Sequence, residues 1–564
     1  MDIDDATTVA TRLLRRRPTE ILPPFLGDAA TGVVAQTVGL VTLAVALFSL
    51  RGTGRIDRLV EAVTELTESE GATDAEIRAV QDAVGGLLTP TVTATLVVGA
   101  VVAVVAVGIF RATVGAAKLN AAMVAVREAR AGPGAATESD RAVGTGSEPS
   151  VETDGGAALG PLTAAVEGVF ADTWRLAGLT ALRAAVLLGP FLVAAVVGPL
   201  ALLLILPALL FAYVGFLFAA EAVVVDGAGP VGGLRRNVTV FRRETAGAVV
   251  YVLLEIGAYA GVLVASGLLA LAGVGRIANV AMLFLLLPWL SLVRMGLYLS
   301  SETVTTTGGP ETVEAAGGDA TDPARRGDGD ETGAGVDAGQ VATRAQEGAV
   351  TVDDRTTRAG ASVGGLRAAV VDLRDGVRRG VVELRRFLAT HPGLFAVSLL
   401  TFVVGAGIGR LLGPSAPEPV TGDPTTVFGN FPLGTAINLT ANNWLVAIGG
   451  GFAGVALGVP TIANLLFNGL LVGTVSGLVD SVAFAALVLP HAVVEVPALA
   501  VGGALGLQFG REGYRVAVGR STAAEFAEEL RRGLLVLIGL LPVFLIAGLV
   551  EAFVTPLVAG IVVG

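Results

Sequence analysis

The chain alternates between long apolar stretches and shorter polar stretches that carry most of its charge. Blocks of about 20 apolar residues match the length that an α-helix needs to cross ~30 Å of hydrocarbon. About eleven such blocks fit the sequence, and polar or arginine-bearing segments separate most of them. The pattern predicts an all-α fold, namely a polytopic transmembrane helical protein with about eleven spans.

The predicted spans fall into two sets on either side of a long acidic stretch. They cover residues 29–50, 90–110, 179–198, 201–223, 246–272, 278–299, 392–413, 442–459, 462–479, 482–508 and 533–556. Because the two spans within 442–479 are short, a re-entrant pair is the alternative to two crossings. We therefore expect two bundles joined by a disordered acidic linker.

Polar composition sets the boundaries between the expected regions. Two stretches are rich in Gly, Ala, Thr and acidic residues and hold few large apolar side chains, which is typical of disorder. The expected organisation is a two-span region with an external helical hairpin (1–130), a linker (131–160), a four-span region (161–300), an acidic linker (301–360) and a C-terminal domain (361–564). Thr73 and Glu76 form a capping-box pattern that predicts the second helix of the hairpin.

The C-terminal domain is expected to begin with a basic amphipathic helix, which five spans follow. Its apolar residues recur three or four positions apart, and arginines lie off that stripe. The apolar stripe is Leu366, Val370, Leu373, Val377, Val381, Leu384 and Leu388, and the arginines are Arg367, Arg374, Arg378 and Arg385. Such a helix either lies flat on an anionic membrane surface or packs on the rest of its domain, and the pattern allows both.

Composition narrows the class of protein. Apolar residues make up 53% of the chain and charged residues 15%, which excludes an ordinary soluble protein. The absence of cysteine excludes disulfides, thiolate catalysis and Cys-ligated metals, and two histidines leave few ligands for zinc. Lys118 is the only lysine. The scarcity of lysine and the acidic polar segments are typical of proteins from an extremely halophilic archaeon. The alternative is that a single protein family has acquired this composition.

Arginine clusters beside alternate spans and so predicts how the chain is oriented. The positive-inside rule places the N-terminus in the cytoplasm, because Arg12, Arg15, Arg16 and Arg17 lie there. An odd number of crossings then places the C-terminus outside. The expected localisation is the cell membrane, with multiple passes and the lipid bilayer as an obligatory partner.

His491 and Glu495 are the most conspicuous ionisable residues in a predicted span. They are four residues apart within Pro490-His-Ala-Val-Val-Glu-Val-Pro497 and therefore share one helix face. Ionisable groups in a span are costly and face a partner or a wet cavity. The pair is either a proton or ion relay, half of a metal site, or a structural polar clamp. No second histidine or cysteine completes a metal site, so none is predicted.

Asparagines and glycines mark further helix faces in the last five spans. Asn442, Asn443, Asn464 and Asn468 are expected to bond neighbouring helices, with direct contact to a ligand as the alternative. Glycines recur four residues apart on three consecutive spans, which predicts close helix packing or an interface with another protein. These glycines include Gly450, Gly454, Gly469, Gly473, Gly502 and Gly506.

Three other residues carry separate expectations. Glu551, near the outer end of the last span, is expected to pair with either Arg410 or His491. Glu255 lies in the middle of the fifth span and is either hydrogen-bonded within the bundle or part of a transport site. Asn438 begins a glycosylation sequon in a predicted external loop, residues 414–441, whereas the sequon at Asn237 is expected to face inside.

The last third of the chain resembles the stage II sporulation protein M family of integral membrane proteins. The resemblance rests on Asn442-Asn443, Asn468-Gly469 with Gly473, the Pro490-His491-x3-Glu495 motif, and Glu551 to Pro556, and it covers about 380–564. In endospore-forming bacteria this family implies a membrane subunit of a complex that anchors peptidoglycan-degrading enzymes. An archaeon would have neither endospore nor such a wall. What the resemblance implies for this chain is therefore the architecture, a five-span module that assembles with partner proteins.

The N-terminal half resembles the membrane domains fused to some glycerophosphodiesterases, through Glu221, Asp226 to Pro230 and Leu234. No nucleotide loop, catalytic triad or cofactor fingerprint is present in the sequence. We therefore expect no enzymatic activity, no cofactor and no nucleic-acid partner. The expected function is a scaffold or anchoring subunit of a cell-envelope complex that contacts other membrane proteins. The alternatives are a permease or channel subunit and an intramembrane hydrolase that uses His491 and Glu495.

Overall fold

The protein is an assembly of helices, seen here in a computed structural model. The structure describes residues 2–68, 73–131, 160–307, 354–413 and 432–562. Within this part of the chain every regular element is a helix, and ten helices are long and apolar enough to cross a membrane. The prediction of an all-α polytopic membrane protein is confirmed.

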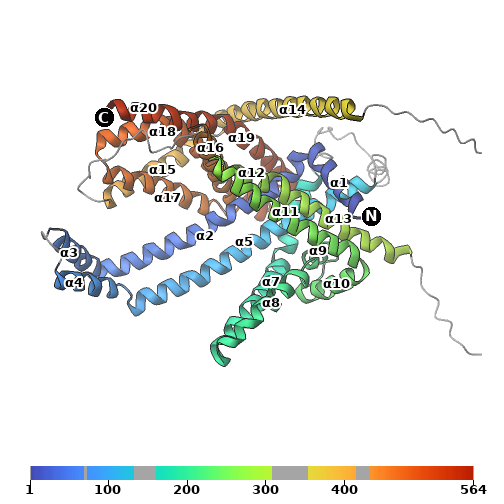
Figure 1. Ribbon diagram of the computed structural model, residues 1–564, viewed down its shortest axis with the longest axis horizontal. Helices are drawn as coiled ribbons and strands as arrows, with labels where there is room; N and C mark the ends of the chain where they lie inside the picture. The colour runs from blue at the N-terminus through green and yellow to red at the C-terminus, as the bar shows by residue number, and fades with distance from the viewer. Residues whose placement is uncertain (1, 69–72, 132–159, 308–353, 414–431, 563–564) are drawn as a thin grey trace, which may run out of the picture. The chain divides into compact units, whose positions relative to one another are not determined.

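The N-terminal region supplies the helices up to α13 (Figure 1). They are α1 (Ile3–Arg16), α2 (Pro18–Gly52), α3 (Arg55–Glu68), α4 (Asp74–Gly85), α5 (Pro90–Ala131), α7 (Gly160–Val197), the 3-10 helix η2 (Pro199–Leu204), α8 (Ile205–Val214), α9 (Ala219–Val225), α10 (Pro230–Arg243), α11 (Thr245–Leu271), α12 (Arg276–Ala281), the π-helix η3 (Met282–Leu286) and α13 (Leu287–Thr307). Gly198, with a φ of 113°, makes the turn between α7 and η2, where the sequence predicts one.

The C-terminal region supplies the remaining helices. They are α14 (Asp354–Thr390), α15 (Pro392–Leu412), α16 (Pro432–Ala453), α17 (Val459–Leu478), α18 (Ser481–Ala517), α19 (Ala523–Leu549), the π-helix η5 (Val550–Val554) and α20 (Thr555–Val562). Leu457 and Gly458 have φ values of 58° and 76° and make the tight turn between α16 and α17. The last predicted span is therefore observed as α19, η5 and α20 in succession.

The ten apolar helices correspond to ten of the predicted spans, and α16 corresponds to the eleventh. The prediction placed that span at 442–459, but the helix begins ten residues earlier, so the predicted external loop is too long. The helix α16 is not apolar enough to count among the ten. It contacts α2, α12, α18 and α19 and buries much of its surface. Because neighbouring helices rather than lipid surround it, small and polar residues are tolerated there.

The hairpin predicted between the first two spans is present. The helices α2 and α5 run side by side, and α3 and α4 lie at their shared end (Figure 1). The capping box forms as expected: the Thr73 hydroxyl accepts from the Glu76 backbone N–H at 3.3 Å, and the Thr73 N–H donates to the Glu76 carboxylate at 2.8 Å.

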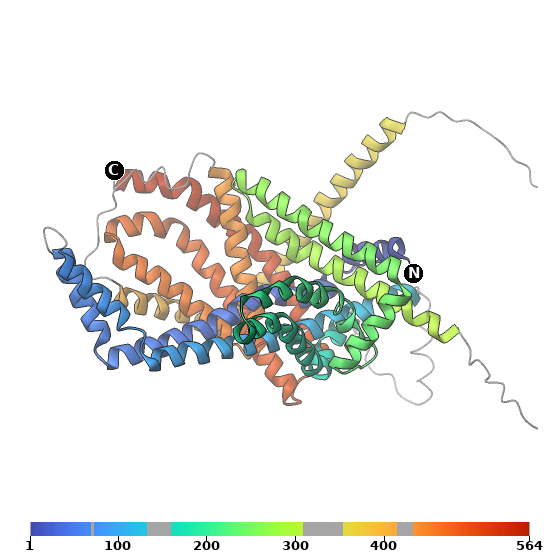
Figure 2. The same cartoon turned by 60° about the horizontal axis from the view of Figure 1, so that its bottom comes forward.

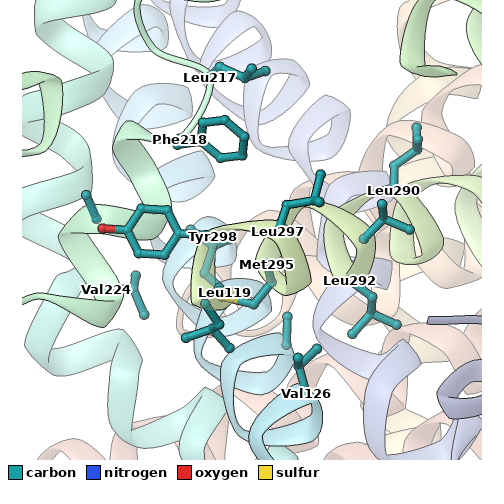
Figure 3. Close-up of a cluster of buried hydrophobic side chains, with 14 of the residues drawn as sticks. Leu119, Val126, Leu217, Phe218, Val224, Leu290, Leu292, Met295, Leu297 and Tyr298 are labelled. Carbon is teal, nitrogen blue, oxygen red and sulfur yellow. The ribbon is translucent and has the colours of Figure 1, made fainter. Parts of the chain in front are cut away.

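Among the described residues, two large hydrophobic clusters hold the helices together, and a small third one joins α2 and α5 through Ala46, Leu50 and Val92. The first lies within the N-terminal region, where Leu119 and Val126 of α5 pack near Phe218 and residues of α13 (Figure 3). The Phe218 and Tyr298 rings lie 6.4 Å apart between their centroids. The second cluster combines residues of both regions. Its buried members include Leu26, Phe110, Val114, Leu162 and Leu283 from the first half and Trp444, Ile448, Phe509 and Leu537 from the second.

The two membrane regions therefore do not remain two separate bundles. Residues Met1–Glu302 and Gly376–Gly564 form one compact unit, and Thr303–Asp375 form another. Trp444 of α16 stacks on Phe284 of η3 with ring centroids 5.1 Å apart, and α12 runs beside α16 (Figure 2). Apolar faces on α2 and α7 pack against the C-terminal helices, so the packing is decided by surfaces far apart in sequence.

The predicted disordered linkers, 131–160 and 301–360, fall mostly outside the described residues. Their edges are helical, because α13 continues to Thr307 and α14 begins at Asp354. The expected amphipathic helix, with its apolar stripe from Leu366 to Leu388, lies within α14, and its side chains are described from residue 372 onward. There Leu384 and Phe387 are buried and Arg378 and Arg385 are exposed. For residues 376–390, the alternative in which the helix packs on its own domain holds.

Glycine positions bring helix backbones into direct contact. A Cβ added at Gly469 or Gly473 of α17 would lie within 3.0 Å of backbone carbonyls of α15, and one at Gly454 within 3.0 Å of the Gly506 carbonyl on α18. The same holds for Gly502 against Ala447. All six glycines predicted to pack helices face a neighbour at such short range: Gly450 meets the Asn464 amide, and Gly506 meets Thr461 and the Gly450 carbonyl.

Two further pairs of glycines, which were not predicted to pack helices, also lie at helix contacts. Gly405 and Gly409 of α15 face α17 across the same contact, and Gly380 of α14 lies against Gly539 of α19. Each of these positions leaves no room for a Cβ. Glycines on both helices of a contact allow the closest approach of the two backbones. Weak Cα–H···O=C contacts form at such short distances.

We expect Gly473→Ala to lower the Tm of the detergent-solubilised protein by overpacking worth ~1–3 kcal/mol. The matched variant is Gly407→Ala, because a Cβ at Gly407 meets nothing within 4 Å. Alanine favours a helix over glycine by up to ~1 kcal/mol, so Gly407→Ala should be neutral or stabilising. Thermal unfolding followed by size-exclusion chromatography measures both. Equal Tm values for the two variants would contradict the proposed close packing.

Candidate functional site

Three ionisable side chains from two distant segments meet in the C-terminal region. His491 and Glu495 of α18 lie beside Glu551 of η5, and one ligand atom from each residue lies within 4.8 Å of the others. All three side chains are half-buried. The His491 Nδ1 lies 3.4 Å from the hydroxyl of the fully buried Thr555. Of the two partners expected for Glu551, His491 is therefore the one nearby.

Local backbone geometry positions these groups. His491 and Glu495 are one helical turn apart and point to the same side of α18, as their spacing predicts. Glu551 lies on the π-helical turn η5, which inserts between α19 and α20. A π-turn holds more residues per turn than an α-helix and changes which side chains face a neighbour. It is the combination of spacing and this turn that gathers the cluster.

The cluster has the chemistry of a cation or proton site. Two carboxylates at short range in apolar surroundings repel each other unless a proton or a cation lies between them. Within the described residues, no lysine or arginine forms an ion pair with Glu495 or Glu551. One imidazole nitrogen and two carboxylates also suit a divalent transition metal. No metal was predicted from the sequence, because no second histidine or cysteine accompanies His491, but the structure adds Glu551 as a third group.

The intramembrane asparagines form a separate polar group. The Asn468 amide donates to the Asn464 carbonyl at 2.8 Å and to its side-chain oxygen at 3.2 Å, within α17. Asn442 donates to the neighbouring Asn443 at 3.1 Å. Asn464 and Asn468 line a small cavity with Gly450. The structure thus assigns these amides to bonds within their own helices, and brings neither Asn443 nor Asn468 to the histidine cluster.

Both sequons lie in helices rather than loops. Asn438 is half-buried in α16, and its side-chain oxygen accepts from the Arg276 N–H at 3.0 Å. The prediction that Asn438 lies in a loop is therefore wrong, whereas its side of the membrane stays a prediction. Asn237 is 2% exposed; it accepts from the Phe218 N–H at 2.7 Å and donates to the Gly215 carbonyl at 2.8 Å. These hydrogen bonds stabilise the turn before α9. The Asn237 amide therefore has its partners within the fold.

A second polar centre lies in the N-terminal region. A role was predicted from the sequence for Glu255 alone, whereas Glu221 was named only for the resemblance of the N-terminal half and Lys118 only as the single lysine. Glu255 accepts from the Tyr213 hydroxyl at 2.7 Å, so it is hydrogen-bonded within the bundle. Glu221 is fully buried and accepts from Arg294 Nε at 2.5 Å. Lys118 donates to both oxygens of Asp28 at 2.9 Å. One signal in the sequence could have revealed this centre. It is an ionisable residue within or beside an apolar span, such as Arg294.

One comparison with known proteins gives a match. Residues 397–556 match the family model of stage II sporulation protein M. No curated protein and no solved structure matches the chain. The match runs from within α15 to the start of α20 and includes all three residues of the histidine cluster. The resemblance of the C-terminal third to this family is confirmed, whereas the resemblance proposed for the N-terminal half stays a prediction.

We expect Arg294→Gln to destabilise the protein by ~3–5 kcal/mol, because it leaves the Glu221 carboxylate buried without its cation. The double variant Glu221→Gln/Arg294→Gln should recover most of that loss, since no charge is then buried. Arg532→Gln is the control: its ion pair with Glu528 is partly exposed and worth at most ~1 kcal/mol. Thermal unfolding in detergent checks all three. A double variant no more stable than Arg294→Gln would exclude this explanation.

Proposed function

We propose that the protein is a non-enzymatic integral membrane scaffold that anchors partner proteins at the cell envelope. The observation that carries this proposal is the glycine-mediated packing of the C-terminal domain. Backbones touch between α15 and α17, between α16 and α18, and between α14 and α19. Helices held this closely form a rigid framework, because sliding or tilting would bring side chains into the glycine contacts. Such a framework suits the positioning of partners.

A charged hollow supplies a place where a partner can dock. It has a volume of about 410 Å³ and lies among the ends of α14, α18 and α19. Its charged lining residues are Glu383, Arg386, Arg511, Glu512, Arg515, Glu525, Glu529 and Arg532. Under the orientation predicted from the arginines, this hollow faces the cytoplasm. Mixed charges of this kind select partners by electrostatic complementarity.

Affinity purification of the full-length protein in mild detergent tests the scaffold. We expect at least one partner at stoichiometric level, and Arg386→Glu should lower its recovery several-fold because Arg386 is a largely exposed charge in the hollow. Arg410→Glu is the control, since Arg410 is exposed but outside the hollow. If no partner is recovered and the reconstituted protein moves a solute, the scaffold proposal fails.

The second candidate is a permease or channel subunit coupled to protons or cations. The cluster of His491, Glu495 and Glu551 favours it, because carboxylates without a cationic partner recur along ion pathways in membranes. Here Glu495→Gln, which keeps the shape and removes the charge, should abolish flux in proteoliposomes and leave partner recovery unchanged. If partner recovery falls while no flux is seen with the wild type, the cluster is a structural clamp of the scaffold.

We also propose that the N-terminus is cytoplasmic and the C-terminus outside. The chain has no cysteine, so a single introduced cysteine is a unique label. Arg78 of α4 and Arg520, between α18 and α19, are both exposed. In intact cells a membrane-impermeant maleimide should label Arg78→Cys, and should label Arg520→Cys only after the cells are opened. The reverse pattern would invert the topology.

A further inference from the structure

The N-terminal region contains a polar cavity of about 310 Å³ that the proposed function does not use. Residues of α2, α5, α7, α11 and α13 line it. The ionisable lining residues are Asp28, Arg111, Lys118, Arg183, Glu255 and Arg294. Four are cationic and two are anionic, so the lining is positive. An excess of one charge between apolar helices is costly unless a ligand or water compensates it.

The pairing of these groups leaves two cations available. Lys118 is held by Asp28, and Arg294 is held by the buried Glu221. Glu255 accepts a hydrogen bond from Tyr213. In the part of the chain that the structure describes, Arg111 and Arg183 form no ion pair. The two arginines come from different helices, α5 and α7, and line the same cavity.

The chemistry of the cavity matches a phosphate-type anion. A guanidinium group donates two parallel hydrogen bonds to phosphate oxygens, and two such groups match one phosphate. The hydroxyl of Ser291 also lines the cavity, as do apolar side chains such as Leu176, Leu179 and Phe216. The volume lies at the lower end of the range for small-ligand sites, ~300–1,000 Å³. The ligand is therefore no larger than a lipid headgroup or a small phosphate ester.

The position along the helices suits an anionic lipid in the inner leaflet. Arg111 directly follows the second predicted span, Arg183 lies near the start of the third and Arg294 near the end of the sixth. By the arginine-based orientation, these are cytoplasmic ends. Basic pockets between transmembrane helices on that side bind lipid headgroups.

We propose that this cavity is a binding site for a phosphate-bearing ligand, held by Arg111 and Arg183. The shared chemistry is a phosphate monoester or diester, supplied either by an anionic phospholipid headgroup or by a soluble phosphate. This inference concerns the N-terminal helices and stands independently of the scaffold proposal.

Thermal unfolding and native mass spectrometry of the full-length protein test the site. Dioleoylphosphatidylglycerol is the lipid probe, dioleoylphosphatidylcholine the zwitterionic comparison, and glycerol 3-phosphate and inorganic phosphate the soluble probes. If only the anionic lipid raises the Tm of the protein, the ligand of the cavity is a lipid headgroup. If a soluble probe raises the Tm, the ligand is a free phosphate. Either result supports the site. If no probe raises the Tm or remains bound, the proposal is overturned.

Variants of the two arginines locate the binding. Arg111→Gln and Arg183→Gln should each weaken binding of the active probe about tenfold, through loss of a charge-assisted hydrogen bond. Because neither arginine forms an ion pair in the part of the chain that the structure describes, both variants should fold. Arg183→Lys keeps the charge but not the two parallel donors, so it should bind at an intermediate level. Arg243→Gln, on the exposed end of α10, should bind as the wild type does. Equal binding by Arg183→Gln and Arg243→Gln would overturn the proposal.

Discussion

Close contact between helix backbones is the constraint on which this structure depends. Lipid tails are as apolar as leucine, so helices in a bilayer gain little from burying apolar side chains and associate through dense packing. Here glycine supplies that packing, because a Cβ at Gly454 or Gly473 would lie within 3.0 Å of a neighbouring backbone atom. The helix α16 shows the consequence: it is too polar to qualify as an apolar span, yet it is central to the unit.

Several charged groups within the bundle follow a second rule, which is that each is neutralised by a partner of opposite charge. Glu221 binds Arg294 and Asp28 binds Lys118, so these charges serve the fold. Two places depart from the rule with opposite signs. Glu495 and Glu551 form a carboxylate pair beside His491, and the cavity near Arg183 carries extra cations. Departures of this kind are costly and are therefore the best places to look for function.

The two halves contribute differently to this picture. The C-terminal third matches a known family, carries the glycine contacts and holds the histidine cluster. The N-terminal region packs on it through α2, α7 and α12 and adds a cavity of its own. A shared hydrophobic cluster joins the halves. The module that matches the family is therefore not an isolated bundle in this chain.

The sequence by itself determined the class of protein, ten of the helices and the faces on which glycines recur. These features are local: hydropathy over about 20 residues and a spacing of four can be read along the chain. The capping box at Thr73 and the shared face of His491 and Glu495 were readable for the same reason. The tertiary structure decided which faces meet. It brought Glu551 to His491, paired Arg294 with Glu221 across two helices, and set α16 among its neighbours. Such contacts depend on how distant surfaces fit, and no pattern along one segment carries that information.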